Sequence, residues 1–79
     1  MKKKEKGEYY MFKIVVVISD KGKKYYKLFY VVVNEKNGKK YDVFLTFDTI
    51  AITTLANCSP IDLDDLEVGC YDLGFNKIN

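Results

Sequence analysis

The stretch from residue 25 to residue 47 limits most strongly what this chain can fold into. It holds two runs of β-branched and aromatic residues that are joined by Asn37-Gly38. Such a pair between two apolar runs is the strongest short-range signal for a β-hairpin, because both residues accept the positive φ angles of a two-residue turn. The turn also sets the strand register. The predicted partners are Val32 with Val43, Tyr30 with Leu45, Leu28 with Phe47 and Lys27 with Asp48.

A second hairpin is predicted from the residues that precede this stretch. The run from Tyr9 to Ser19 is β-branched and aromatic almost throughout, which favours a strand. Asp20-Lys21-Gly22 then predicts a three-residue turn with glycine at the positive-φ position. Both turns place the same residues of the middle strand on one face. We therefore expect a three-stranded antiparallel meander over residues 9–19, 24–34 and 40–48, with Val16 opposite Tyr26, Ile14 opposite Leu28 and Phe12 opposite Tyr30.

Two short helices and a fourth strand are predicted after the meander. Asp48 is a suitable N-cap for a first helix, although the Thr and Ile content of the segment also fits a strand. Ser59-Pro60, followed by Asp62, predicts the start of a second helix. The expected ranges are 49–57 and 60–66 for the helices and 70–76 for the strand. The expected fold class is α+β, with a sheet that either stays open or closes into a small barrel.

Length and composition predict one small domain. The 79 residues are too few for two cores, so we expect a single domain over residues 9–79 after a charged, disordered tail at residues 1–8. No run approaches the ~18 apolar residues of a membrane span, and the basic N-terminus lacks the pattern of a signal peptide. We therefore expect a cytoplasmic protein that does not bind membranes.

Charge is divided unevenly along the chain. Residues 1–47 hold twelve lysines and five acidic residues, a net charge of +7, whereas residues 48–79 hold one lysine and six acidic residues, a net charge of −5. Two interpretations are open. Either the acidic segment folds back on the basic hairpins, or the molecule has a basic pole and an acidic pole that can each attract a partner.

The chain lacks the residues on which most catalytic sites depend. It contains no His and no Arg, which removes the commonest general base and the side chain that best grips phosphate. Cys58 and Cys70 have no further Cys or His to complete a zinc site, and the acidic residues within 62–67 lack the glycine turn of a calcium loop. We therefore predict a non-enzymatic protein with no metal site and no cofactor.

The predicted meander has two apolar faces. The first face is expected to be the core side and holds Tyr10, Phe12, Ile14, Val16, Ile18, Tyr26, Leu28, Tyr30, Val32, Tyr41, Val43, Leu45 and Phe47. The second face holds Met11, Lys13, Val15, Val17, Tyr25, Lys27, Phe29, Val31, Val33, Asp42, Phe44, Thr46 and Asp48. A half-solvated antiparallel sheet should be polar on its second face, and this one is not.

Three interpretations of the second face are open, because the residues after the meander are needed over the first. The chain can bury the face itself, the face can bind a partner protein or a second copy, or it can bind single-stranded DNA or RNA. We expect a protein-interaction module first and nucleic-acid binding second. The lysine-only basic residues and frequent Asn, Ile and Tyr suggest an A/T-rich genome, that of a low-GC bacterium, its phage or a mobile element. We expect an accessory protein of a phage or mobile element that binds a partner. The candidate binding residues are Lys13, Lys23, Lys24, Tyr25, Lys27, Phe29, Lys39, Lys40 and Phe44.

Overall fold

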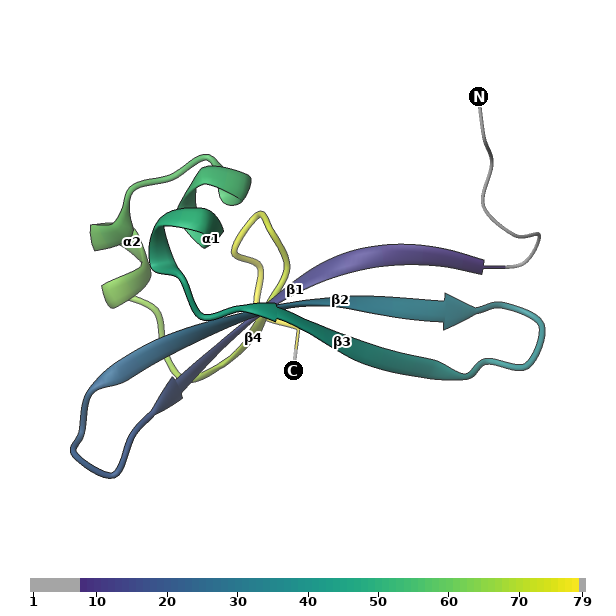
Figure 1. The fold of residues 1–79 in the computed structure, drawn as a ribbon, viewed down its shortest axis with the longest axis horizontal. Helices are drawn as coiled ribbons and strands as arrows, with labels where there is room; N and C mark the ends of the chain where they lie inside the picture. Colours follow the sequence, from purple (N-terminus) through teal and green to yellow (C-terminus); the bar gives the residue numbers. More distant parts are fainter. Residues whose placement is uncertain (1–7, 79) are drawn as a thin grey trace.

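A computed structural model of the chain describes residues 8–78. Its four strands form one antiparallel sheet in the order β3-β2-β1-β4 (Figure 1). The sheet stays open, so the predicted α+β fold with a β-meander is confirmed and the barrel is not formed. The elements are β1 (Glu8–Ile18), β2 (Lys24–Asn34), β3 (Lys40–Thr46), α1 (Thr49–Ala56), α2 (Pro60–Asp64) and β4 (Gly69–Tyr71). The tail predicted at residues 1–8 lies outside the described residues, except for Glu8.

The first turn is as predicted. Ser19 N donates to Lys23 O at 2.8 Å, and Gly22 N donates to Ser19 O at 2.9 Å. Gly22 has a φ of 82°, which glycine adopts without the steric cost of a Cβ. The predicted register between β1 and β2 is confirmed for Val16 with Tyr26, Ile14 with Leu28 and Phe12 with Tyr30.

The second turn differs from the prediction by two residues. Asn34 N donates to Lys39 O at 2.9 Å and Gly38 N donates to Asn34 O at 2.8 Å, so the loop has four residues rather than two. The observed pairs are Val32 with Tyr41 and Tyr30 with Val43, so the predicted pairs Val32 with Val43 and Tyr30 with Leu45 are wrong. A shift of two residues leaves the side chains of β3 on their predicted faces, because side chains alternate with a period of two.

A β-bulge at the end of β3 moves Phe47 to the second face. The observed register would place Leu45 opposite Leu28, but Thr46 takes that position, so β3 holds one extra residue. The alternation of faces is reversed beyond this point. The Phe47 ring accordingly packs on Phe44, with 4.7 Å between ring centroids. The prediction that Phe47 faces Leu28 on the first face is therefore wrong.

The first helix is confirmed over the strand alternative. Asp48 Oδ1 accepts a hydrogen bond from Ile50 N at 2.9 Å, so Asp48 is the predicted N-cap. It cannot also be the strand partner of Lys27, and that part of the prediction is wrong. The helix ends at Ala56, and its C-cap Asn57 has a left-handed φ of 61°.

The second helix and the last strand are shorter than predicted. α2 starts at its predicted first residue but ends at Asp64, before the expected end. β4 has three residues and pairs with β1. Asp72 follows the strand and turns the chain, because its Oδ1 accepts hydrogen bonds from the backbone nitrogens of Gly74 and Asn76, both at 2.9 Å.

The hydrophobic core lies under one half of the first face. Figure 1 shows both helices over one end of the sheet, whereas the end with the β2–β3 loop has no helix above it. A helix of eight residues spans only about 12 Å, but a strand of eleven residues spans about 36 Å. The expectation that the whole first face is core is therefore wrong. The buried core residues are Ile14, Val16, Tyr26 and Leu28 from the sheet, with Ile52, Leu63 and Tyr71.

We call the uncovered end of the sheet the distal wing, formed by residues 8–13, 29–34 and 40–44. Its central strand is shielded by its neighbours in the sheet, and Val31, Val32 and Val33 are buried. The flanking aromatic side chains on the first face are not. Tyr10 is 55% exposed and Tyr41 is 62% exposed.

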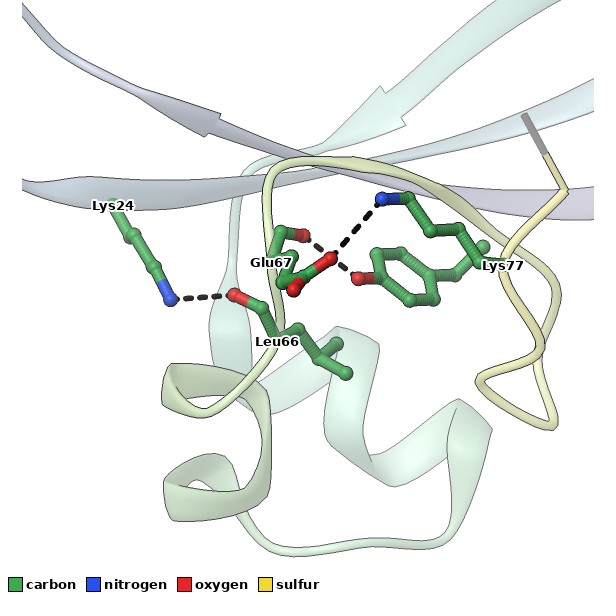
Figure 2. A network of polar contacts seen from close by, with 5 residues as sticks. Lys24, Leu66, Glu67 and Lys77 are labelled. Atoms are coloured by element: carbon green, nitrogen blue, oxygen red, sulfur yellow. Dashed lines mark hydrogen bonds and ion pairs between the residues drawn. The ribbon is translucent and has the colours of Figure 1, made fainter.

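Polar contacts tie the segment between α2 and β4 to the rest of the molecule (Figure 2). Lys24, from β2, donates to Leu66 O. The Tyr71 hydroxyl donates to Glu67 O at 2.8 Å, and Lys77 Nζ lies 3.3 Å from Glu67 Oε1. These contacts fix the acidic segment beside the core.

Ion pairs within residues 8–78 do not join the basic and acidic parts of the sequence. Lys13 pairs with Asp42, and Lys77 pairs with Glu67, each within its own part. The acidic residues around α2 lie at one end of the molecule and the β2–β3 loop lies at the other (Figure 1). Lys24 of β2 nevertheless donates to the backbone of Asp64 and Leu66, so the acidic segment folds back on the first hairpin, and only the β2–β3 loop stays apart from it (Figure 1).

Candidate binding surface

Four aromatic rings form a continuous row on the second face. The centroid distances are 6.1 Å from Tyr25 to Phe47, 4.7 Å from Phe47 to Phe44 and 5.6 Å from Phe44 to Phe29. We call these four residues the aromatic row. Phe47 is 58% exposed and Phe44 is 45% exposed. Both helices pack on the first face, so neither covers the row.

The pairing of β2 with β3 explains why these rings meet. Tyr25 and Phe29 lie four positions apart on β2, so both point to the second face. The register places Phe44 directly opposite Phe29. The bulge then returns Phe47 to the same side, where it closes the gap between Phe44 and Tyr25.

Two lysines lie against rings of the row. Lys27 Nζ is 5.9 Å from the centroid of Tyr25, and Lys13 Nζ is 5.5 Å from the centroid of Phe29, within the range of cation–π attraction. Lys13 also reaches from β1 across β2 to form an ion pair with Asp42 on β3 at 2.6 Å. The charge of Lys13 is thus compensated, whereas Lys27 forms no ion pair within residues 8–78.

The structure separates the other predicted lysines from the row. Lys24 lies on the first face, where its Nζ donates to Leu66 O (Figure 2) and, at 3.0 Å, to Asp64 O. The ammonium group of Lys24 therefore binds the C-terminal end of α2 and is not available to a partner. Lys23 lies in the first turn and Lys39 in the second, whereas Lys40 starts β3 on the second face and lines the same hollow as Lys13 and Asp42, away from the rings. The structure therefore brings together Lys13, Tyr25, Lys27, Phe29 and Phe44, and adds Phe47.

A hollow of about 220 Å³ lies beside the ion pair of Lys13 and Asp42. Met11, Val31 and Ile78 supply apolar lining. The hollow extends the apolar surface of the second face from the row towards β4.

Sequence reasoning missed Phe47 and the exposed first face of the distal wing. No residue pattern in β3 predicts the bulge. Strict alternation of side chains along the strand therefore assigns Phe47 to the core. The exposed wing did have a signal, because two helices of the predicted lengths are too short to cover strands of eleven residues.

Within the described residues, Cys58 lies in surroundings that lower the reactivity of its thiol. Cys58 packs against the core, and burial, followed by the nearby Asp62 carboxylate, raises the pKa of its thiol. A protonated thiol is a poor nucleophile. Within residues 8–78, no group of three or more His, Cys, Asp or Glu side chains is placed to hold a metal ion, and neither helix is long and apolar enough to cross a membrane.

No protein-family model, curated protein or solved structure matches this chain.

Proposed function

We propose that this chain is a non-enzymatic protein-binding module whose second face docks a partner surface that is apolar at its centre and acidic at its edge. The observation that carries the proposal is the aromatic row, four touching rings on a sheet face that neither helix covers. Aromatic side chains are enriched at the centres of protein interfaces. Lys27 supplies the positive charge next to Tyr25.

The size of the row suits the centre of an interface. A Phe or Tyr side chain buries roughly 150–250 Å², so the three rings that are 39–58% exposed, Tyr25, Phe44 and Phe47, offer roughly 200–350 Å². At about 25 cal/mol per Å², covering them contributes roughly 5–9 kcal/mol before the entropic cost of association is subtracted. Contacts around the row must supply the remaining affinity.

Two features favour a protein over single-stranded nucleic acid. Phe47 and Phe44 are tilted by 54° and Phe44 and Phe29 by 73°, so the rings pack on one another instead of presenting parallel faces to bases. Lys13 is paired with Asp42, and Lys24 is bound to backbone carbonyls. Fewer cations are therefore left for phosphates than the sequence suggests.

Paired variants of β3 test the proposal. Phe44→Asp places a carboxylate in the aromatic row, whereas Tyr41→Asp places one on the opposite face of the same strand. Affinity capture from the source cells, quantified by mass spectrometry, should retrieve the same partner with the wild type and with Tyr41→Asp. Capture with Phe44→Asp should fall at least tenfold while its circular dichroism spectrum stays unchanged.

Two outcomes would overturn the proposal. One is that Phe44→Asp captures the partner as well as the wild type does. The other is saturable binding of a labelled single-stranded oligonucleotide in fluorescence anisotropy, weaker at about 200 mM than at about 50 mM salt and lost in Phe44→Asp, which would assign the row to nucleic acid.

A further inference from the structure

The first face of the distal wing carries an aromatic patch distinct from the aromatic row. The Tyr10 and Tyr30 rings meet edge to face, with 5.8 Å between their centroids. Tyr10, Phe12 and Tyr30, with Met11, line a hollow of about 310 Å³. Tyr41 lies across Val32 from Tyr10 in the strand register. We call Tyr10, Phe12, Tyr30 and Tyr41 the wing patch.

The wing patch is compatible with a second copy of itself. A two-fold axis brings the same patch of both subunits together, so a charged patch would face its own charge. None of the four side chains of the wing patch is charged. The second face, in contrast, carries Lys27 and Lys40 beside the paired Lys13 and Asp42, and this excess of positive charge would repel its own copy.

The shape of the molecule leaves room for one further sheet over the wing patch. The helices form a second layer over the other half of the first face, and this layer does not extend over the distal wing (Figure 1). A helix layer is about 10 Å thick, and two packed sheets are separated by about 10 Å. A second distal wing therefore fits beside the helices, provided that the two copies run in opposite directions with their helices at the outer ends.

Charge favours the same opposed arrangement. The β2–β3 loop and the start of β3 carry Lys36, Lys39 and Lys40 against Glu35, whereas the helix end, residues 48–79 together with the lysine-containing first turn at residues 20–24, has a net charge of −3. In the opposed arrangement each basic loop points towards the helix end of the other copy. The attraction steers the two copies into this orientation rather than the parallel one.

We infer that two copies of this chain associate through their wing patches, in opposed orientation, to form a reversible dimer. The inference does not depend on the proposed function, because it uses the other face of the sheet. The patch is small: four partly exposed rings offer roughly 300–400 Å² per copy, below the ~800 Å² of a standard interface. Dimerisation is accordingly weak, with a dissociation constant in the micromolar to millimolar range.

Sedimentation velocity over protein concentrations from about 10 μM to about 1 mM tests the dimer. The wild type should shift from monomer towards dimer over this range, and added salt should weaken the shift. Tyr41→Asp and Tyr10→Asp should stay monomeric throughout. Phe44→Asp, on the second face, should dimerise like the wild type.

Circular dichroism confirms that each variant is folded, which both exposed tyrosine positions should allow. A wild type that remains monomeric at the highest concentration would overturn the inference. So would a Tyr41→Asp variant that dimerises normally. Loss of the dimer in Phe44→Asp alone would assign self-association to the aromatic row instead.

Discussion

Tyr26 joins the middle strand to α2 through a single hydroxyl group. The side chain is buried, and its hydroxyl donates to Asp64 Oδ1 at 2.7 Å. Burial, together with the hydrogen bond to Asp64, raises the pKa of Tyr26 well above its ordinary value of 10.0. The hydroxyl therefore stays protonated and remains a donor at all moderate pH values.

We expect Tyr26→Phe to lower the free energy of unfolding by about 1–2 kcal/mol, because it leaves a carboxylate without its donor. Urea denaturation followed by circular dichroism measures the change. Tyr41→Phe, at an exposed ring, is the matched control and should have no effect.

Because the pKa of Tyr26 is raised on folding, the stabilising contribution of its hydroxyl is complete below pH 10.0 and is lost as pH rises above it. The alkaline loss of stability should be smaller in Tyr26→Phe, and equal stability of the two proteins would contradict the prediction.

Local residue preferences predicted the length of the first turn correctly and the length of the second turn wrongly. Gly22 and its neighbours leave one compact turn available, and the register followed. Asn37-Gly38 favours a two-residue turn, but Asn34 Oδ1 accepts a hydrogen bond from Lys36 N at 2.9 Å and stabilises a longer loop. That competition depends on side-chain geometry, which residue preferences do not contain.

The sequence predicts which face of the sheet a side chain lies on more reliably than it predicts which residue lies opposite. Tyr25, Phe29 and Phe44 lie together as expected, because an error of two residues in register preserves the alternation. Phe47 could not be placed, because one extra residue reverses the alternation. The ion pair between Lys13 and Asp42 was also beyond prediction, since the two residues lie on strands that are not neighbours.

The turn after β4 should respond to acid. Asp72 accepts hydrogen bonds from the backbone and side chain of Asn76 and from the backbone of Gly74, and these lower the pKa of its carboxyl from the ordinary 3.8. A lowered pKa means that the contribution is present above pH 3.8 and is lost as pH falls through the folded-state value.

We therefore expect the amide resonances of Gly74 and Asn76 to move towards disordered positions in NMR spectra recorded below pH 3.8. The amide of Gly22, in a turn without a carboxylate acceptor, serves as the internal control. Asp72→Asn should remove most of the pH dependence. Unchanged resonances of Gly74 and Asn76 through the acid titration would contradict this account.

At the scale of the whole molecule, the two halves of the sheet have different support. One half is backed by α1, α2 and Tyr71, and its central side chains Ile14 and Val16 are fully buried. The distal wing has no helix over it, and Tyr10 and Tyr41 are largely exposed. Regions with few buried apolar contacts open locally at lower free energy than the core.

Hydrogen exchange should resolve the two halves. In dilute, monomeric protein we expect amides of β2 at Tyr30 and Val32 to exchange at least tenfold faster than those at Tyr26 and Leu28, although all four lie in the central strand. NMR-detected exchange measures the rates residue by residue. Equal protection along β2 would show that the sheet opens only as a single unit.

Separating the core from the distal wing has a consequence for how such a chain can evolve. Substitutions at the wing leave Ile52, Leu63 and their sheet partners untouched. Selection can therefore alter what the outer strands recognise while the folding unit stays constant. We therefore expect divergence between descendants of this chain to be concentrated in the uncovered strands, with the helix-backed half changing more slowly.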